Sequence, residues 1–320
     1  MQILETKSIY YDDVNLISQW NQHLKSRTDI KPELDRIIAS PMASIVGETF
    51  AKEALKLGIT VVLPRFKGLD WQKNILNKCI KEDLDVSRLW LSIGLEDNFI
   101  ELPLSIPFGG VLIDVANGGM ATVLEKTQQL AICKSHAEFG RIMIGNFHNV
   151  ECVKPYFNIP TTRPIVRVNI GGGQQCTTAS KATGYGRGQI TEIQEFANYK
   201  DKIIVAADGG VRDSACAAKA FGAGADTVIL GTYFSKAEEA QNIIDGEYKC
   251  WGSASDYNQE KFGSKRRHAE GRVTEIDKGE IKPLKYLIDE LWGGISSAVS
   301  YSGHTSLSHY IGQGIFELKK

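Results

Sequence analysis

One cysteine stands between a glycine-rich turn and two hydroxyl side chains, in the segment IGGGQQCTT at residues 170–178. A thiol at the end of a strand, partly exposed and close to helix N-termini, has a lowered pKa and can act as a nucleophile. The glycines before Cys176 also leave main-chain carbonyl oxygens accessible, and these could coordinate a monovalent cation. A cysteine at an arbitrary position is usually inert, so the loop alone leaves a catalytic and a structural interpretation open.

Two later segments carry the features of phosphate-binding loops. Asp208, Gly209 and Gly210 follow the apolar run IIVAA, and Gly231 and Thr232 end the run TVIL. Glycines let backbone N–H groups approach a phosphate closely, and the N-terminus of the next helix favours an anion. The alternative interpretation is a pair of tight turns with a helix-capping aspartate.

The elements that must position these loops are short β-branched runs, each followed by a polar loop and then by apolar residues at helical spacing. Near-continuous apolar strands that alternate with helices indicate a parallel sheet. Eight such strands predict a (β/α)8 TIM barrel over residues 1–320 as one domain, with an open doubly wound sheet as the alternative. In a barrel, all the loops named above lie at the C-terminal ends of strands, where the active sites of such folds are found. The expected strands are residues 37–40, 59–63, 89–93, 111–115, 141–145, 164–170, 203–207 and 227–231.

Residues 245–282, the flap, break this pattern because they are polar, rich in Gly, Ser and charge, and have neither helical nor strand period. A stretch of this length is either disordered or a functional lid. Trp251, Tyr257 and Phe262 argue against complete disorder. The segment that follows predicts a helix from Leu284 that ends at Gly293 and Gly294.

Composition excludes several classes of function. The 320 residues have a formal net charge of -1, so no overall field attracts nucleic acid. No run of about 18 apolar residues predicts a membrane span. The six cysteines form no CxxC pair, which suggests reduced thiols in the cytoplasm, and the six histidines lack metal-ligand spacing.

The segment IGGGQQCTT resembles the catalytic loop of the IMP dehydrogenase/GMP reductase family, whose pattern is Gly-x-Gly-x-x-Cys-Thr-Thr. The likeness covers nearly the whole chain, because LKSRTDI, SPMAS, DVANG, ADGGVRD and LWGGISSAVSYSG occur in the family's order. No regulatory cystathionine-synthase-type (CBS) domain is inserted. DVANG, LKSR and the absence of an Arg-Tyr pair on the flap favour the reductase branch.

The resemblance implies an oxidoreductase that converts GMP, or a related purine nucleotide, to IMP and ammonia with NADPH or NADH. Cys176 would attack carbon 2 of the purine to form a covalent thioimidate, and Thr178 with Glu270 would supply the proton for the departing ammonia. It also implies a potassium-type monovalent cation held by main-chain carbonyls, and a cytoplasmic homo-oligomer, a tetramer.

The resemblance assigns further residues to binding roles. Those for the nucleotide are Ser40, Met42, Asp208, Gly209, Gly210, Gly231, Thr232, Trp251, Gly252 and Gly271. Those for the cofactor are Ser26, Arg27, Arg65, Asp114, Ala116, Arg267, Ser297 and Ser300. Those for the cation are Gly171, Gly173 and Cys176.

The chain departs from the family pattern around the nucleotide. Gln174 and Gln175 occupy the part of the loop where the family has a phosphate-binding serine, and Ala179 replaces an arginine that contributes to cation binding. Trp251 occupies the expected place of a base-stacking methionine. These differences keep two alternatives open: a modified purine nucleotide as substrate, and a non-catalytic barrel that binds a purine nucleotide. The other branch of the family, an IMP dehydrogenase that makes XMP from IMP and NAD, is the third alternative.

Overall fold

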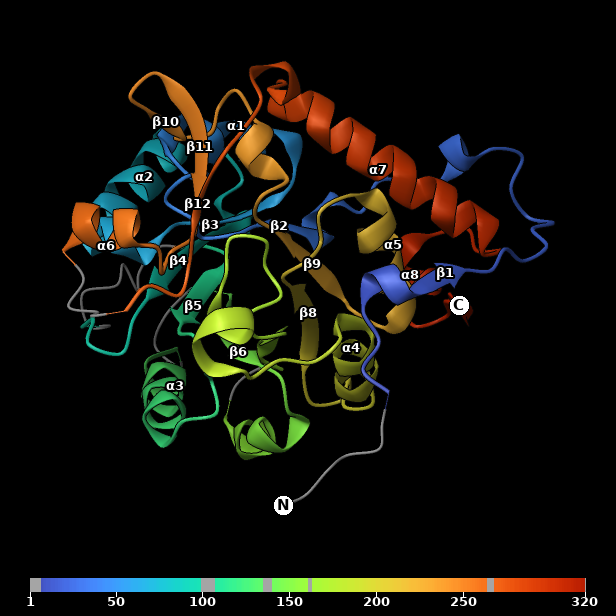
Figure 1. The fold of residues 1–320 in the computed structure, drawn as a ribbon, viewed down its shortest axis with the longest axis horizontal. Helices are drawn as coiled ribbons and strands as arrows, with labels where there is room; N and C mark the ends of the chain where they lie inside the picture. Colours follow the sequence, from blue (N-terminus) through green and yellow to red (C-terminus); the bar gives the residue numbers. More distant parts are fainter. Residues whose placement is uncertain (1–6, 99–106, 135–139, 161–162, 264–267, 320) are drawn as a thin grey trace.

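A closed barrel of eight parallel strands is the centre of the computed structural model, which describes residues 7–98, 107–134, 140–160, 163–263 and 268–319 (Figure 1). All eight predicted strands are confirmed, with ends shifted by at most two residues. The open-sheet alternative is wrong, because the first and last barrel strands pair with each other, with Ile38 opposite Ile229. In chain order the strands are β2 (Ile37–Ala39), β3 (Thr60–Val62), β4 (Leu89–Ile93), β5 (Gly110–Asp114), β6 (Arg141–Phe147), β7 (Ile165–Val168), β8 (Ile204–Asp208) and β9 (Thr227–Leu230).

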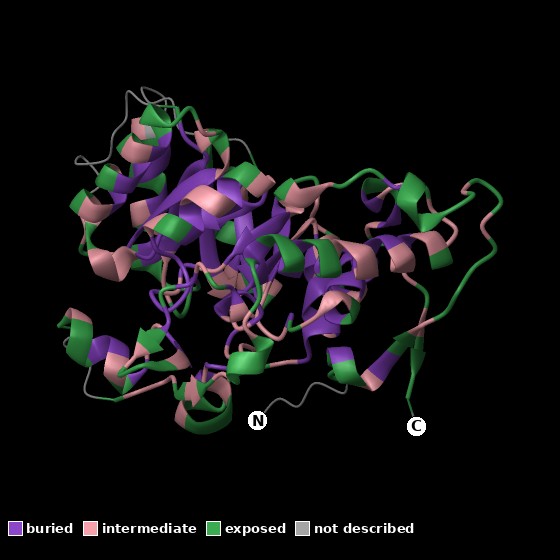
Figure 2. Cartoon of the chain, turned by 90° about the horizontal axis from the view of Figure 1, so that it is seen from above, coloured by how far each residue is buried: buried purple, intermediate pink, exposed green. Residues whose placement is uncertain are grey.

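The barrel strands are buried on both faces, which explains their continuous apolar sequences. In β2, Ile38 belongs to a cluster inside the barrel with Leu112 and Met143, whereas Ile37 and Ala39 pack outward against the helices. Figure 2 shows this buried centre within a more exposed outer layer. The interior is therefore filled by side chains, so a ligand site has to lie at an end of the barrel.

The outer layer consists of α1 (Glu48–Leu57), α2 (Leu69–Lys81), α3 (Ala121–Lys134), α4 (Gln189–Ala197), α5 (Ser214–Ala223), α7 (Leu284–Tyr301) and α8 (Leu307–Tyr310). The predicted end of the helix at Gly293 and Gly294 is wrong, because α7 continues to Tyr301. A Cβ added to Gly294 would lie 2.1 Å from the Ser214 Oγ of α5. Glycine therefore serves here to let the two helices approach closely, and does not end the helix.

Two further strands join the ends of the chain. β1 (Val14–Leu16) pairs antiparallel with β13 (Phe316–Leu318), so the N-terminal segment and the C-terminal segment lie side by side next to α7 and α8 (Figure 1). None of the helices in the described part of the chain has the length and apolar character needed to cross a lipid bilayer.

The flap contains more regular structure than its sequence predicts. Its strands β11 (Glu247–Trp251) and β12 (Val273–Glu275) form a three-stranded antiparallel sheet with β10 (Ile243–Ile244), which comes just before the flap, and α6 (Asp256–Phe262) lies between β11 and β12 in the chain. The interpretation that the whole flap is disordered is therefore wrong for its described residues. The sheet lacked a sequence signal because its strands are short and partly solvated, so they show no continuous apolar face.

Candidate active site

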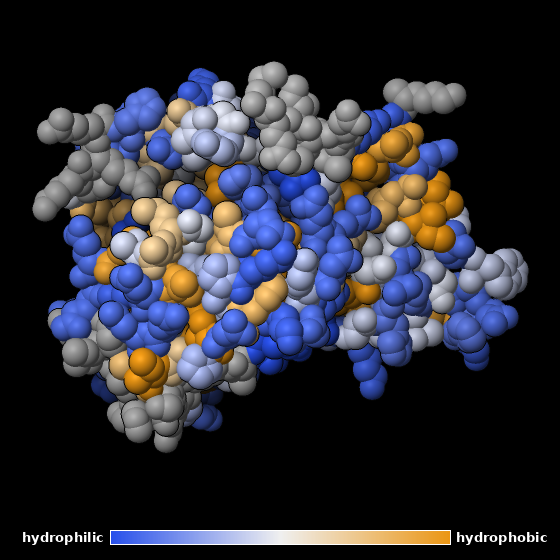
Figure 3. All heavy atoms as spheres, turned by 90° about the horizontal axis from the view of Figure 1, so that it is seen from below, coloured by the Kyte–Doolittle hydropathy of each residue, from blue (hydrophilic) through white to orange (hydrophobic). Residues whose placement is uncertain are grey.

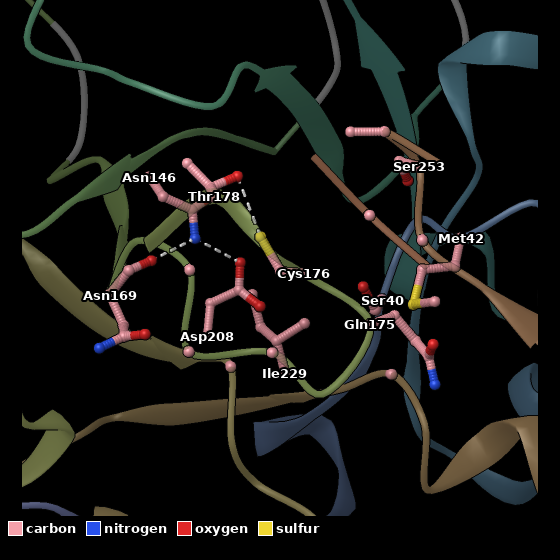
Figure 4. Close-up of a pocket in the computed structure, with 18 of the residues that line it drawn as sticks. Ser40, Met42, Asn146, Asn169, Gln175, Cys176, Thr178, Asp208, Ile229 and Ser253 are labelled. Atoms are coloured by element: carbon pink, nitrogen blue, oxygen red, sulfur yellow. Dashed lines mark hydrogen bonds between the residues drawn. The ribbon is translucent and has the colours of Figure 1, made fainter. Parts of the chain in front are cut away.

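A cavity of about 220 Å³ lies at the C-terminal ends of the barrel strands, between the strand loops and the flap. Figure 4 shows side chains from several of these loops pointing toward a common space. Most of the residues assigned from the sequence line it. They are Ser40, Met42, Arg65, Asp114, Ala116, Gly171, Gly173, Cys176, Thr178, Asp208, Gly209, Gly210, Gly231, Thr232, Gly252, Glu270 and Gly271.

Cys176, Thr178 and Glu270 form a continuous chain of hydrogen bonds at the cavity wall. The Cys176 thiol donates to Thr178 Oγ1 at 3.2 Å, and the Thr178 hydroxyl donates to Glu270 Oε2 at 2.8 Å (Figure 4, for the first of these bonds). Thr178 is buried, whereas Cys176 is partly exposed. A proton can therefore move between the thiol and the carboxylate through one hydroxyl group that both accepts and donates.

The turn before the cysteine depends on glycine. Gly171 has a φ of +76°, and a Cβ there would lie 2.4 Å from the Cβ of Ala179. The Cys176 N–H donates to the Gly173 carbonyl at 2.9 Å, which closes the turn. Immediately afterwards Thr178 begins a short π-helix, Thr178–Thr183. The loop thus folds back on itself and fixes the thiol near the threonine.

The flap is held against this loop by the two glutamines that depart from the family pattern. Gln175 Nε2 donates to Thr274 Oγ1 of β12 at 2.7 Å. The backbone carbonyls of Gln174 and Gln175 accept hydrogen bonds from Arg272 Nε at 2.8 Å and Arg272 N at 3.0 Å. These contacts bring the return strand of the flap, and with it Glu270, to the loop that holds Cys176.

A buried arginine links two carboxylates of the cavity. Arg167 of β7 lies 2.7 Å from Asp114 Oδ1 and 2.6 Å from Asp208 Oδ2, and Asn146 Nδ2 donates to the same Asp208 oxygen at 2.8 Å. Burial would raise the pKa of Asp114, but the positive charges of Arg167 and Arg65 outweigh it and hold that pKa below its ordinary value. Asp114 is thus an ionised acceptor for a ligand's polar groups.

Arg167 and Asn146 were missed by the sequence analysis. A signal for Arg167 was present, since a charged residue inside the apolar strand IVRV has to find a partner in the fold. Asn146 carried no comparable signal, because its partner Asp208 is 62 residues away in the chain.

The two glycine loops assigned to phosphate pack tightly against their neighbours. Gly209 has a φ of +109°, and a Cβ there would lie 2.8 Å from the Gly173 backbone nitrogen. A Cβ on Gly231 would lie 2.8 Å from Met42 Sδ. The loops after β2, β7, β8 and β9 therefore meet at one rim with bare backbone, as close approach of a ligand requires.

The assignment of Trp251 to the nucleotide cavity is wrong for its side chain. The indole is buried, packs edge-on against Tyr257 with ring centroids 5.0 Å apart, and lies outside the lining of the cavity. Its large apolar ring is accommodated beneath α6, and the turn that follows, Gly252 with Ser253 and Ala254, faces the cavity instead. The sequence analysis did not assign Ser253 and Ala254 to the cavity, because the residues of this turn carry no catalytic or charged side chain.

The predicted cofactor residues divide into two groups. Arg65, Asp114 and Ala116 line the cavity. The other described members do not. Arg27 donates to Ser297 Oγ at 2.7 Å, so Ser26, Arg27, Ser297 and Ser300 gather where residues 26–29 meet α7. The remaining predicted residue, Arg267, lies outside the described residues.

Among the described residues, no group of three or more His, Cys, Asp or Glu side chains could hold a metal ion. The cation predicted for this loop would depend on main-chain carbonyls. One of these, from Gly173, already accepts the Cys176 N–H and keeps one lone pair available.

Comparisons with a family model and with individual known proteins indicate the same family. A model of the IMP dehydrogenase / GMP reductase domain matches residues 106–317. The chain is 29% identical over 290 residues to a GMP reductase of Bacillus subtilis, covering 85% of this chain and 82% of that protein. It is 28% identical over 284 residues to one of Lysinibacillus sphaericus (85% and 81%) and 27% identical over 317 residues to one of Ligilactobacillus salivarius (93% and 92%).

Proposed function

The chain belongs to the IMP dehydrogenase / GMP reductase family, whose members are NAD(P)-dependent oxidoreductases of purine nucleotides, and on that premise we propose that it is a GMP reductase-like enzyme. It would convert GMP, or a related purine nucleotide, to IMP and ammonia. The observation that carries this proposal is the hydrogen-bonded chain of Cys176, Thr178 and Glu270 at the wall of the cavity.

In the proposed reaction, the Cys176 thiol passes its proton through Thr178 toward Glu270, and the resulting thiolate attacks carbon 2 of the purine. The same path then returns a proton to the amino group, which leaves as ammonia when the carbon–nitrogen bond breaks. The purine remains attached to the sulfur as a thioimidate. Carbon 2 would receive a hydride from NADPH or NADH held near Asp114, and the carbon–sulfur bond would then break to release IMP and the Cys176 thiolate.

The residues around Asp114 fit a nicotinamide. The Asp114 carboxylate is ionised, and the buried Arg65 Nε has no hydrogen-bond partner and lies 3.4 Å from Asp114 Oδ2. An amide group beside this pair would find one acceptor and one donor, the complement of its own N–H and C=O. We propose that these two side chains orient the carboxamide of NADPH or NADH.

We propose that the second group of cofactor residues serves a neighbouring copy of the chain in a homotetramer. Ser26, Arg27, Ser297 and Ser300 are not among the residues that line the cavity of their own chain, which favours contact with a cofactor in another subunit. Apolar side chains gather in separate patches on the surface (Figure 3). Exposed Ile17, Ile315 and Tyr301 lie together near this group, since the Ile17 N–H donates to the Ile315 carbonyl and the Gln19 N–H to that of Tyr301. Such a surface favours association.

The direct test is to incubate the purified protein with GMP and NADPH while following NADPH absorbance and released ammonia. Oxidation of NADPH with equimolar ammonia supports the proposal. Turnover only with a modified guanine nucleotide would assign the alternative substrate. XMP production from IMP and NAD would instead identify an IMP dehydrogenase.

A non-catalytic barrel is tested separately by covalent labelling. 6-Chloropurine ribotide should add its purine ribotide to wild-type Cys176, visible as a mass increase, and leave Cys176→Ala unmodified. A wild-type protein that binds the ribotide reversibly and gains no mass would favour a nucleotide sensor.

A further inference from the structure

A second cavity, of about 550 Å³, lies between the barrel and the flap and takes no part in the proposed reaction. Its walls come from the loop after β3, from α2, from residues 240–243 and from α6. α2 and α6 lie on the same side of the barrel (Figure 1). A cavity of this size is within the range that holds a small ligand.

Two lysines from different parts of the chain face this cavity. Lys67 follows β3, and its Nζ donates to the Val46 carbonyl at 3.3 Å and to Gln241 Oε1. Lys261 belongs to α6 of the flap, and its Nζ donates to the Tyr257 hydroxyl at 3.3 Å. Across the described residues, no carboxylate forms an ion pair with either ammonium group, so two positive charges face the cavity without a counter-ion.

Burial and the charge of Lys261 lower the pKa of Lys67 to about 8. A buried ammonium group that is also repelled by a second cation is costly in the free protein. An anion between the two lysines would offset both effects, because it would attract the charged form of each. Binding of such an anion should therefore weaken as pH rises above 8 and Lys67 loses its proton.

Flat aromatic side chains complete the walls. The Lys67 Nζ lies 4.5 Å from the centroid of the Trp71 ring, and Phe66 and Phe262 line the same cavity. Rings of this kind stack on a flat heterocycle. The walls thus combine two positive charges with aromatic surface, which matches a ligand that carries both a ring and a negative charge.

We propose that this cavity binds a nucleoside phosphate, with the phosphate between Lys67 and Lys261 and the base against the aromatic residues. Because Lys67 belongs to the barrel and Lys261 to the flap, the bound anion joins these two parts. The flap carries Glu270, so the ligand would also favour the contact between Glu270 and Thr178. This last consequence rests on the proposed function, whereas binding itself does not.

The test is isothermal titration calorimetry at pH 7 with AMP, adenosine and inorganic phosphate as probes, without cofactor or substrate. AMP should bind more tightly than either other probe. Lys67→Met and Lys261→Met should each weaken AMP binding at least about tenfold, Lys67→Arg should retain it, and Lys285→Met, which removes an exposed lysine of α7, should have no effect. AMP should also slow hydrogen exchange of residues 243–262 in the wild type and not in Lys67→Met.

Three results would overturn the proposal: no AMP binding, binding that is lost in Asp208→Asn and kept in both lysine-to-methionine variants, or phosphate binding as tight as AMP binding. The second would place AMP in the active-site cavity. Since calorimetry requires no turnover, a protein that reduces GMP but fails this test refutes the second site alone.

Discussion

The hydroxyl of Thr178 lies 2.8 Å from the carboxylate of Glu270, although 92 positions separate the two residues in the chain. One belongs to the loop after β7 and the other to the flap, so this contact exists only when the flap lies on the barrel. The backbone adds a second link nearby, since the Thr177 N–H donates to the Glu270 carbonyl at 2.8 Å. In the proposed reaction, proton transfer would therefore require the flap to lie on the barrel.

Glu270→Gln should reduce kcat for GMP by about 100-fold or more, because an amide cannot take up and return the proton that Thr178 relays. Thr178→Val should have a comparable effect, and the double variant should be little worse than either, since both act in one step. Steady-state kinetics of the three variants test this. Glu275→Gln, an exposed change on β12, is the control. Fully additive losses would show that the two residues act independently.

How far the sequence predicts this molecule depends on the range of the interactions involved. The barrel was predictable because every strand is buried on both faces and so carries its own apolar signal, as in LWLSI of β4. Cys176 and Thr178 were predictable because they lie two residues apart in one loop. The Arg167 bridge between Asp114 and Asp208 was not predicted, because it depends on three strands that meet only after the barrel closes. The indole of Trp251 was misplaced for a similar reason: its position depends on packing against α6.

Gln175→Ala should weaken flap closure by removing the hydrogen bond to Thr274. We expect KM for the nucleotide to rise several-fold, with a loss of global stability of only about 1 kcal/mol, the usual value for one hydrogen bond. Thr274→Val should change KM and stability by similar amounts, and the double variant should show little further change in either. Kinetics combined with urea unfolding separate the two effects. A large fall in unfolding free energy with an unchanged KM would contradict a role in closure.

The buried carboxyl group of Glu192 should make the stability of the protein depend on pH. Burial raises the pKa of this residue to about 8, even though Asn169 Nδ2 donates to it at 2.8 Å and Arg187 lies near. In the unfolded chain the group has its ordinary value of 4.5. Between these two values the folded state holds a proton that the unfolded state has lost, so stability falls as pH rises from about 4.5 to about 8.

Glu192→Gln removes this titration and should be more stable than the wild type at pH 8, by a free energy of about 4 kcal/mol. Near pH 5 the two proteins should differ little. Urea unfolding at pH 5, 6, 7 and 8 measures the difference, with the exposed change Glu238→Gln as control. Equal slopes of unfolding free energy against pH in wild type and Glu192→Gln would show that Glu192 does not titrate in this range.

Substitution by alanine at two adjacent glycines of α7 should change the stability of the protein in opposite directions. A Cβ on Gly293 meets nothing within 4 Å, so Gly293→Ala should stabilise the protein by up to about 1 kcal/mol through helix propensity. A Cβ on Gly294 would lie 2.1 Å from Ser214 Oγ, so Gly294→Ala should force α7 away from α5 and cost about 1–3 kcal/mol. Denaturant unfolding of both variants gives the comparison. Adding Ser214→Gly to Gly294→Ala should recover part of the loss, because it removes the atoms that the new methyl group would meet. Equal stability of the two single variants would mean that the close approach of α5 and α7 does not depend on Gly294.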